Sequence, residues 1–351
     1  MRETLKSRLH QAVLRAWLQR GPVAWLLWPL SLLMGAVVRM RRHAYRAGLL
    51  ASSHPGVPVI VVGNVVAGGA GKTPTVMAVV RHLQSRGLKT GVISRGWGRH
   101  DDAVVPVRAD SSPAEVGDEP LLIHHQTGVP VFVGARRIDA ARALLRSHPD
   151  TDVIVCDDGL QHLALRRDIE ICVFDERGIG NGFLLPAGLL REPWPRQVDL
   201  VLVTTSGRSG SPPPGVGGGF TARRMLAGMI ERADGTRATL AELGRQRFLA
   251  VAGIARPQAF FDMLADAGVK PAQIQALPDH YDFSSWISPI DAGITVICTE
   301  KDALKLWGVC PQAWAVGLQL TPEPAFFAAL DLRVDAALGR SLSSPHGHQT
   351  A

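Results

Sequence analysis

A glycine-rich stretch followed by lysine and threonine carries the clearest chemical signal in the sequence. Residues 68–73 read Gly-Gly-Ala-Gly-Lys-Thr, between an apolar, β-branched run at 59–62 and a helical pattern from Val76 to Leu83. A strand, a glycine loop and a helix in this order form a P-loop, whose backbone N–H groups and helix N-terminus bind phosphate oxygens. The lysine reaches the β- and γ-phosphates, and the threonine hydroxyl binds Mg²⁺. The stretch predicts ATP and Mg²⁺ as cofactors and these nucleotide-binding residues: Val66, Ala67, Gly68, Gly69, Ala70, Gly71, Lys72 and Thr73.

The loop departs from the usual motif at one position. Glycine ordinarily stands five positions before the glycine that precedes the lysine, and Val66 takes that place here. The alternative interpretation is a plain glycine turn that leads into a helix. The apolar run before the loop favours the P-loop.

Two adjacent carboxylates follow a second apolar run. Asp157 and Asp158 come directly after Val153–Cys156, which has the form of a Walker B strand. Such a strand delivers a carboxylate to the metal beside a P-loop, and two neighbouring acids are costly unless a cation faces them. Asp157 continues the strand and is the better metal ligand, whereas Asp158 could hold a water molecule or a neighbouring base. The alternative is an acid pair that caps the next turn.

Phosphoryl transfer to an alcohol needs a base at the acceptor oxygen, and two residues are candidates. Asp118 lies in a Gly-Asp-Glu-Pro turn that opens a helical stretch, where capping of that helix is an equally good interpretation. His280 lies in the polar segment Asp279–Asp282, although a single histidine is more often structural. Other charged residues are candidates for phosphate or acceptor contacts, with ordinary solvated charges as the alternative: Arg95, Arg99, Arg191 and Glu192.

Strand-like and helical stretches alternate along the chain. Beyond the runs already described, the strand-like stretches are Lys89–Ser94, Val129–Val133, Ile169–Asp175 and Val198–Thr204. The alternation predicts an α/β fold of the P-loop NTPase type, with a mostly parallel sheet and helices on both faces. A smaller C-terminal α/β unit is expected from strands at Phe248–Ala252 and Ile294–Thr299 and a helix at Pro257–Ala267.

The chain divides by composition into five parts. Residues 1–50 form a basic and apolar helical segment, and residues 51–205 form the P-loop core. Residues 206–220 are rich in Pro, Gly and Ser and read as a linker or loop. The smaller α/β unit covers residues 221–337, and residues 338–351 are expected to be a disordered tail.

The positive charge of the chain is confined to its N-terminal part. The formal net charge is +7, from 38 Lys and Arg and 31 Asp and Glu. Residues 1–50 hold nine of the basic residues and one of the acidic ones, which leaves 29 basic and 30 acidic residues in the remainder. This distribution indicates an anionic membrane surface as partner and argues against nucleic acid. The four cysteines are widely spaced and read as free thiols in a reducing compartment.

An uncharged stretch from Gly21 to Val38 lies within this basic part. Tryptophans at 17, 25 and 28 gather at its start, as in an interfacial anchor. Its length is near the lower limit for a membrane span, and Pro22 and Pro29 interrupt it. These features favour a helix that lies in the membrane interface over a spanning one. A helix packed on the protein's own core or on a partner subunit is the third interpretation.

Seven ordered motifs make the sequence resemble the lipid A tetraacyldisaccharide 4'-kinases. They are GNVVAGGAGKTP (63–74), SRGWGR (94–99), GDEP (117–120), VCDDGLQH (155–162), LLPAGLLREP (184–193), LPDHYDF (277–283) and TEKDALKL (299–306). The resemblance covers most of the chain, including the N-terminal helix. A non-glycine residue at position 66 is usual in that family, whereas Trp97 stands where the family commonly has tyrosine.

The resemblance implies a function and a set of roles. It implies a membrane-associated kinase that phosphorylates the 4'-hydroxyl of an acylated disaccharide 1-phosphate with ATP, forming lipid IVA at the cytoplasmic face of the inner membrane. It implies Asp118 as the base, supported by His280, and Lys72 at the phosphates. It also implies Thr73, Asp157 and Asp158 at Mg²⁺ with Glu192 and Gln161 nearby. The expected substrate contacts are Arg95, Arg99, Gln161 and Arg191.

Other P-loop proteins are the rival interpretations. A membrane-associated regulatory ATPase shares the glycine loop, but its signature lysine before the paired glycines is replaced by Ala67. A GTPase needs Asn-Lys-x-Asp for guanine, and the nearest candidate, Glu300-Lys301-Asp302, has the wrong spacing. The regulatory ATPase therefore remains the main alternative.

Overall fold

The computed structural model describes residues 16–99, 101–206, 213, 215–287 and 293–339. The helices are α2 (Pro22–Arg46), α3 (Lys72–Ser85), α4 (Pro113–Val116), α5 (Asp118–Thr127), α6 (Arg137–Ser147), α7 (Leu240–Leu243), α8 (Pro257–Asp266), α9 (Glu300–Leu306) and α10 (Pro324–Ala337). The strands are β1 (Val59–Gly63), β2 (Thr90–Ser94), β3 (Val105–Pro106), β4 (Val131–Val133), β5 (Val153–Asp157), β6 (Ile169–Phe174), β7 (Leu200–Thr205), β8 (Phe220–Glu231), β9 (Arg237–Thr239), β10 (Phe248–Ala252), β11 (Gln273–Ala276), β12 (Thr295–Thr299) and β13 (Trp314–Pro322).

Strands of the described residues form one mixed sheet. Its order is β11-β10-β12-β13-β8-β7-β6-β1-β5-β2-β4-β3, with β9 paired to β8. The strands from β8 to β4 are parallel to their neighbours, and so are those from β11 to β13. The antiparallel pair β8–β13 joins the two blocks. The expected α/β fold with a mostly parallel sheet is confirmed, and so are the strands expected in both units.

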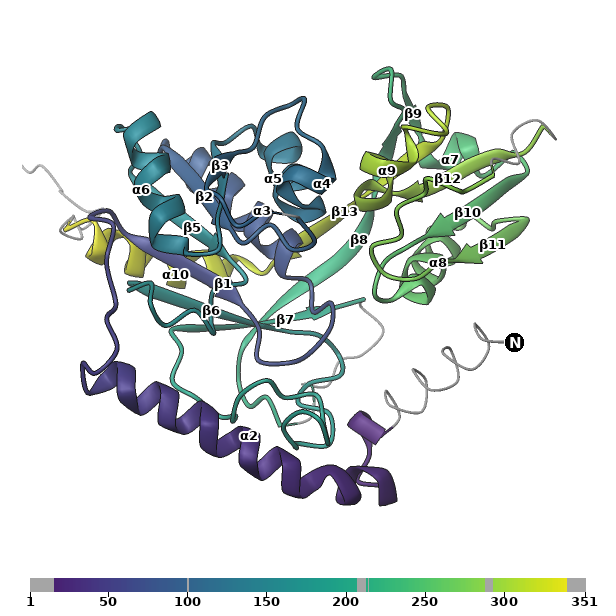
Figure 1. The fold of residues 1–351 in the computed structure, drawn as a ribbon. Coiled ribbons are helices and arrows are strands. Elements are labelled where there is room, and N and C mark those ends of the chain that lie inside the picture. Colours follow the sequence, from purple (N-terminus) through teal and green to yellow (C-terminus); the bar gives the residue numbers. More distant parts are fainter. Residues whose placement is uncertain (1–15, 100, 207–212, 214, 288–292, 340–351) are drawn as a thin grey trace, which may run out of the picture.

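Helices cover both faces of the central strands. Because side chains alternate along a strand, Ile60 and Val62 of β1 enter one core and Val59 and Val61 enter the other. The first core is covered by α3, α5 and α10, and the second by α6 together with the segment around Leu189. These two layers hold the carboxyl ends of β1, β2 and β5 at one edge of the sheet (Figure 1).

The C-terminal residues return to the P-loop core. Strand β8 pairs with β7 at Phe220–Arg223 and with β13 from Ala222 to Glu231, so the sheet continues past the expected linker. Helix α10 then places Phe326, Leu330 and Val334 in the same core as Ile60. The division into five parts stays a prediction. Residues 207–212 and 214 of the expected linker and residues 340–351 of the expected tail lie outside the described residues.

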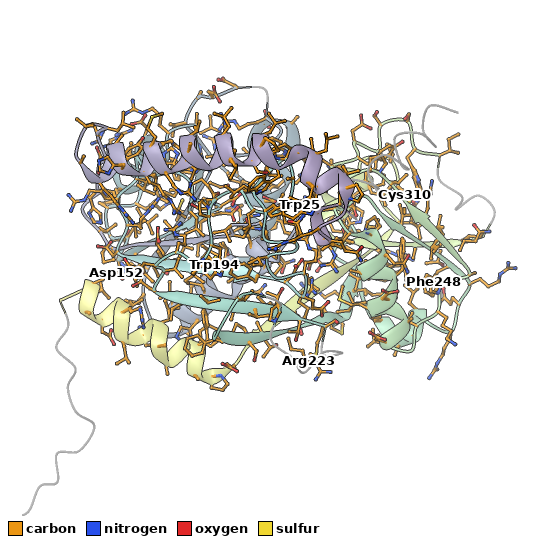
Figure 2. The ribbon with its side chains drawn as sticks, turned by 90° about the horizontal axis from the view of Figure 1, so that it is seen from below. Trp25, Asp152, Trp194, Arg223, Phe248 and Cys310 are labelled. Atoms are coloured by element: carbon orange, nitrogen blue, oxygen red, sulfur yellow. The ribbon has the colours of Figure 1, made fainter. Side chains whose placement is uncertain are left out.

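Helix α2 lies apart from the sheet, along the outside of the core (Figure 2). Its buried residues are small, Ala24, Ser31 and Gly35, and Trp25 and Trp28 contact Phe183 of the body. The Ser31 hydroxyl donates a hydrogen bond to the backbone oxygen of Leu184. Many of its large apolar side chains are exposed, as at Leu26, which is 78% exposed. Packing on the protein's own core therefore buries only a small part of the surface of this helix.

Candidate active site

The glycine loop between β1 and α3 has the geometry of a phosphate cradle. Gly68 and Gly71 have φ angles of +88° and +85°, which glycine adopts without steric cost. Gly71 is the N-cap of α3, so the free N–H groups of the first turn face the loop. The Thr75 hydroxyl donates to the backbone oxygen of Gly71 at 2.8 Å and fixes this junction. The loop is thus prepared for an anion at the helix N-terminus.

A second segment is attached to this loop by backbone hydrogen bonds. The N–H of Ala67 donates to Leu189 at 2.8 Å, and the N–H of Arg191 donates to Val65 at 2.7 Å. This pairing brings the Arg191 guanidinium to 3.4 Å from the Asp158 carboxylate. Lys72 lies 3.7 Å from the same carboxylate. Two cations and an acid therefore meet in front of the loop.

The carboxylate of Asp157 lies at the end of β5 and is 1% exposed. Burial, together with the charges of Glu119 and Asp158, raises its pKa to about 7. Ser94 Oγ donates to its Oδ2 at 3.3 Å, whereas its Oδ1 has no hydrogen-bond partner among the described residues. Asp158 Oδ1 is likewise buried without a hydrogen-bond partner in the part of the chain that the structure describes. Orphaned carboxylate oxygens beside the P-loop lysine fit a divalent cation.

The residues available for such a cation are few. Among the described residues, no group of three or more His, Cys, Asp or Glu side chains converges as a metal cage. A P-loop site does not need one, because phosphate oxygens and water complete the shell of Mg²⁺.

A histidine and a carboxylate meet at the opposite wall. His280 Nδ1 lies 2.9 Å from Asp118 Oδ2, and Lys305 Nζ donates to the same oxygen at 2.8 Å. Burial alone would raise the pKa of Asp118, but the hydrogen bonds from His280 and Lys305 and the charges of Lys305 and Lys301 outweigh it, and the pKa is lowered. Gly117, not Asp118, is the N-cap of α5, so helix capping does not explain this carboxylate.

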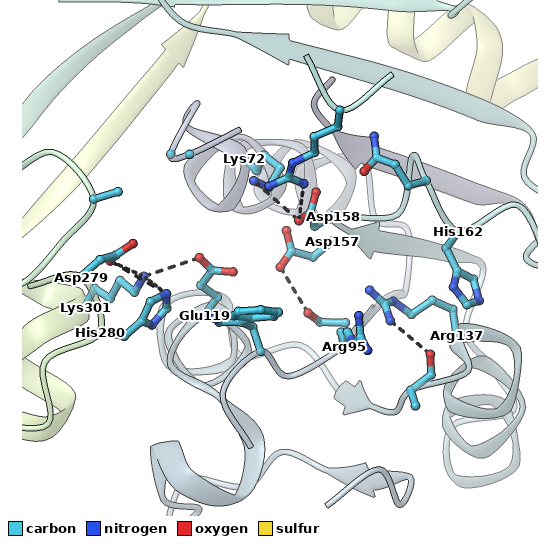
Figure 3. A pocket seen from close by; sticks show the side chains of 18 of the residues that line it. Lys72, Arg95, Glu119, Arg137, Asp157, Asp158, His162, Asp279, His280 and Lys301 are labelled. Carbon is cyan, nitrogen blue, oxygen red and sulfur yellow. Dashed lines mark hydrogen bonds and ion pairs between the residues drawn. The ribbon is translucent and has the colours of Figure 1, made fainter. Parts of the chain in front are cut away.

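These groups surround an open pocket of about 800 Å³, shown in Figure 3. Glu119, Asp279, His280 and Lys301 lie on one side of the Asp157–Asp158 pair in this view. Arg137 and His162 lie on the other side. The expected residues that line the pocket are Gly68, Gly69, Lys72, Arg95, Asp157, Asp158, Gln161, Arg191 and His280.

Some expected residues lie elsewhere. Asp118 is 6% exposed and sits behind His280 instead of lining the pocket. Glu192 is also buried, and its carboxylate is held by Arg42, Arg196 at 3.1 Å and Gln161 at 3.0 Å. Arg99 lines a separate cavity of about 500 Å³. Thr73 and the loop residue Ala70 line a smaller cavity of about 210 Å³ next to the loop.

Several residues in or next to the pocket have no role that was predicted from sequence. Lys301 and Lys305 belong to the motif at 299–306, and their spacing of four places them on one face of α9. His162 ends the motif at 155–162. Arg137 follows β4, and the position of a residue just after a parallel strand was a usable signal, because carboxyl ends of such strands share one edge.

A P-loop, a buried carboxylate beside it and a carboxylate–histidine pair across one pocket define a P-loop kinase. Comparison with known proteins identifies the family. Residues 23–335 match the model of the tetraacyldisaccharide-1-P 4'-kinases, and the chain belongs to this family.

Individual relatives agree with this assignment. A tetraacyldisaccharide 4'-kinase of Acidovorax sp. (strain JS42) is 56% identical over 328 residues, which cover 93% of this chain and 96% of the relative. One from Polaromonas naphthalenivorans (strain CJ2) is 53% identical over 350 residues, 97% of this chain and 100% of the relative. A crystal structure of LpxK from Aquifex aeolicus in complex with ATP has a TM-score of 0.76 at 27% identity and covers 89% of this chain and 99% of that one.

Proposed function

We propose that this chain transfers the γ-phosphate of ATP to the 4'-hydroxyl of tetraacyldisaccharide 1-phosphate and so forms lipid IVA in lipid A biosynthesis. The observation that carries the proposal is the meeting of the P-loop, the Asp157–Asp158 pair and His280 around one pocket. Family membership supports the same activity and disfavours the regulatory ATPase. A base across the pocket from the P-loop would serve to take the proton of an acceptor hydroxyl.

In the proposed site the P-loop binds the nucleotide. Residues 66–73 supply backbone N–H groups to the phosphates, and Lys72 neutralises charge that develops on the transferred group. Arg191 lies on the same side, next to Asp158. Asp157 and Thr73 would hold Mg²⁺, with Asp158 beside them, and the ion when bound would neutralise phosphate charge. Glu192 would act there only through Gln161.

His280 is the better candidate for the base, with Asp118 as the residue that positions it. The sequence and the resemblance favoured Asp118 as the base, but its carboxylate is buried and its lowered pKa makes it a weak one. His280 lines the pocket, and its Nδ1 faces Asp118, so Nε2 is the nitrogen that would take the proton of the acceptor hydroxyl. Lys301 Nζ lies 3.4 Å from this Nε2 and would have to give way to the acceptor. Asp118 would stabilise the imidazolium that forms.

The properties of helix α2 are consistent with a lipid acceptor that lies in a membrane. The helix is long and apolar enough to cross a membrane by length and composition, with a mean hydropathy of 1.7 and 17% of its most apolar window buried. Its exposed residues and the basic residues around it suit the surface of an anionic bilayer. ATP as co-substrate and four free cysteines support the cytoplasmic face of the inner membrane. No role for nucleic acid is proposed.

Label transfer tests the proposed activity. Purified protein is incubated with γ-labelled ATP, Mg²⁺ and tetraacyldisaccharide 1-phosphate in detergent micelles. Wild type should label the lipid, and Lys72→Ala should not. His280→Asn should lower kcat by about 10²- to 10⁴-fold, the usual contribution of a general base. Asparagine is chosen because it tolerates the φ of +59° at this position, so the backbone should keep its conformation. His125→Asn, on exposed α5 surface, is the matched control.

An unlabelled lipid with active ATP hydrolysis would contradict the proposal and favour the regulatory ATPase. Full transfer by His280→Asn, combined with loss in Asp118→Asn, would return the role of base to Asp118.

A further inference from the structure

Lys301 is a cation of the pocket that has no assigned role in the proposed reaction. It is the second residue of α9, and it lines the pocket of about 800 Å³ together with Gly69 and His280. It also lines the cavity of about 210 Å³ next to the loop, which it shares with Lys72 and Thr73. Its ammonium group therefore lies in the space in front of the P-loop, where the terminal phosphates of a bound nucleotide would be.

The contacts of Lys301 are loose. Its Nζ lies 3.6 Å from Glu119 Oε1, 3.8 Å from Asp279 Oδ1 and 3.4 Å from His280 Nε2. All three distances are longer than the roughly 2.7–2.9 Å of a charge-assisted hydrogen bond. One turn further along α9, Lys305 donates to a buried carboxylate at 2.8 Å. The second lysine is thus fixed by its partner, whereas Lys301 can change its position by side-chain rotation alone.

The contact between Lys301 and His280 defines the state of the imidazole. An ammonium group can only donate, so this contact requires a lone pair on His280 Nε2. The ring is then neutral and carries its proton on Nδ1, which faces Asp118 at 2.9 Å. This is the form that a general base needs before the acceptor binds. When the acceptor hydroxyl takes the place at Nε2, Lys301 loses this contact and needs another partner.

The charges around Lys301 indicate where that partner would be. Burial and then the charge of Glu119 raise the pKa of Asp157, so Glu119 lies within electrostatic range of the carboxylate beside the P-loop. Figure 3 shows Lys301 directed toward Glu119 from the side of His280, whereas Lys72 lies beside the carboxylate pair. A phosphoryl group in transfer spreads negative charge over three equatorial oxygens. One lysine cannot face all three.

We propose that Lys301 is a second catalytic cation, which moves from His280 to an equatorial oxygen of the transferred phosphoryl group when the acceptor binds. The inference rests on the proposed function. In that step the acceptor oxygen forms its bond to the γ-phosphorus, and the bond from this phosphorus to the β,γ-bridging oxygen breaks. The proton of the hydroxyl goes to His280 Nε2, and the electron pair of the broken bond stays on ADP. Lys301 moves no proton and neutralises charge from the side of His280, while Lys72 does so from the P-loop.

The pH profile of kcat tests this role, with label transfer to tetraacyldisaccharide 1-phosphate as the assay. Lys301→Met removes the charge and should lower kcat by about 10²- to 10³-fold, the cost of one donor to a developing charge. The loss should persist at pH 9, where His280 is neutral with or without a cation beside it. The Kd for ATP without acceptor should be unchanged, and Lys301→Arg should recover part of the rate. Lys270→Met, at an exposed site outside the pocket, is the matched control.

Other outcomes separate the inference from the proposed function. A loss confined to low pH, with the full rate at pH 9, would show that Lys301 acts only on His280 and would overturn the inference. A wild-type kcat in Lys301→Met, or a weaker Kd for ATP that explains the whole loss, would also overturn it. In these cases wild type still labels the lipid and the kinase stands, whereas an unlabelled lipid with wild type would overturn the proposed function itself. Lys301→Gln repeats the profile if Lys301→Met does not fold, and it should show the same loss.

Discussion

The residues of the pocket hold conformations and charges that burial alone would not favour. Asp158 and His280 have φ angles of +47° and +59°, and residues other than glycine seldom adopt this backbone region. Such positions persist where the surrounding structure fixes them, commonly at functional sites. Asp157 adds a buried carboxylate, one oxygen of which has no hydrogen-bond partner within the described ranges. Unfavourable backbone conformations and buried charges of this kind are expected at residues that have a catalytic or binding function.

The raised pKa of Asp157 predicts a pH-dependent gain in stability for Asp157→Asn. Its pKa is about 7 in the folded protein, from burial first and then Glu119 and Asp158, against about 3.9 in an unfolded chain. A raised carboxyl pKa stabilises the fold fully below the unfolded value, and this contribution is lost as pH rises through the folded value. Asparagine does not titrate, so Asp157→Asn should melt higher than wild type at pH 8 and show a smaller difference at pH 5. Thermal unfolding with chelator and without nucleotide measures this, and a difference that shrinks with pH would contradict it.

Lys305 is predicted to be a positioning residue for the Asp118–His280 pair. Its ammonium donates to the same Asp118 oxygen that faces His280. Lys305→Met should lower kcat by about tenfold to a hundredfold, the range of a hydrogen bond to a charged group, because the buried carboxylate is then held by fewer donors. Lys305→Arg should recover part of the rate, and KM for ATP should stay unchanged in both. Equal kcat values for Lys305→Met and wild type would show that His280 alone orients Asp118.

The motifs that supply the chemistry could be predicted from residue types and spacing, whereas the contacts between distant residues could not. The P-loop and the Asp157–Asp158 pair could be read from sequence, because each is a continuous motif on one strand and one loop. The Asp118–His280 pair joins residues 162 positions apart, so spacing could not establish their contact or decide which one faces the pocket. Arg137 follows a strand-like stretch, which was a usable signal, but the sheet order that brings it to the site could not be read from sequence.

At the scale of elements, the strands with continuous apolar runs were predictable and the long connecting strands were not. β1, β5 and β10 are buried along their whole length, which produces the runs of β-branched and apolar residues. β8 contains paired arginines and is half exposed, so no such run marks it. β8 and β13 nevertheless join the two blocks of the sheet (Figure 1). Propensity alone could not reveal pairing that long-range contacts create.

Helix α2 carries a prediction about membrane binding. Leu26 and Leu33 are 78% and 64% exposed, so Leu26→Gln/Leu33→Gln should leave the fold stable. Each leucine that enters the interface contributes about 1.5–3 kcal/mol. The double variant should therefore bind anionic vesicles at least about tenfold more weakly than wild type. Ile287→Gln, at an 88% exposed site outside α2, is the control.

Vesicle sedimentation measures this difference. Equal binding of the double variant and wild type would show that the exposed face of α2 does not enter the bilayer.

At the scale of the whole molecule, the last helix ties the C-terminal residues to the P-loop core. The pair β8–β13 extends the sheet from one unit to the other, and α10 returns across β7 and β8. Composition suggested a linker at 206–220, because Pro, Gly and Ser dominate there, but it could not show that the chain crosses back afterwards. Closure of the two units over ATP and acceptor stays a hypothesis, which scattering profiles with and without both ligands would test.

The shared core predicts that the units unfold together. Phe326 of α10 is fully buried against the central core. Phe326→Ala should lower the free energy of unfolding by about 3–5 kcal/mol, the usual cost of such a cavity. Both units should respond in one transition, monitored by tryptophan fluorescence and by far-UV circular dichroism. Two separate transitions, with only the later part of the chain affected, would contradict a common core.

Coupling of ATP consumption to lipid phosphorylation tests the central claim most directly. ATP turnover and labelled tetraacyldisaccharide are measured in one reaction, with and without acceptor. The account predicts one phosphorylated lipid for each ATP consumed and little turnover without acceptor, because the base at His280 serves the acceptor hydroxyl. ATP hydrolysis that proceeds without acceptor and leaves the lipid unlabelled would contradict it.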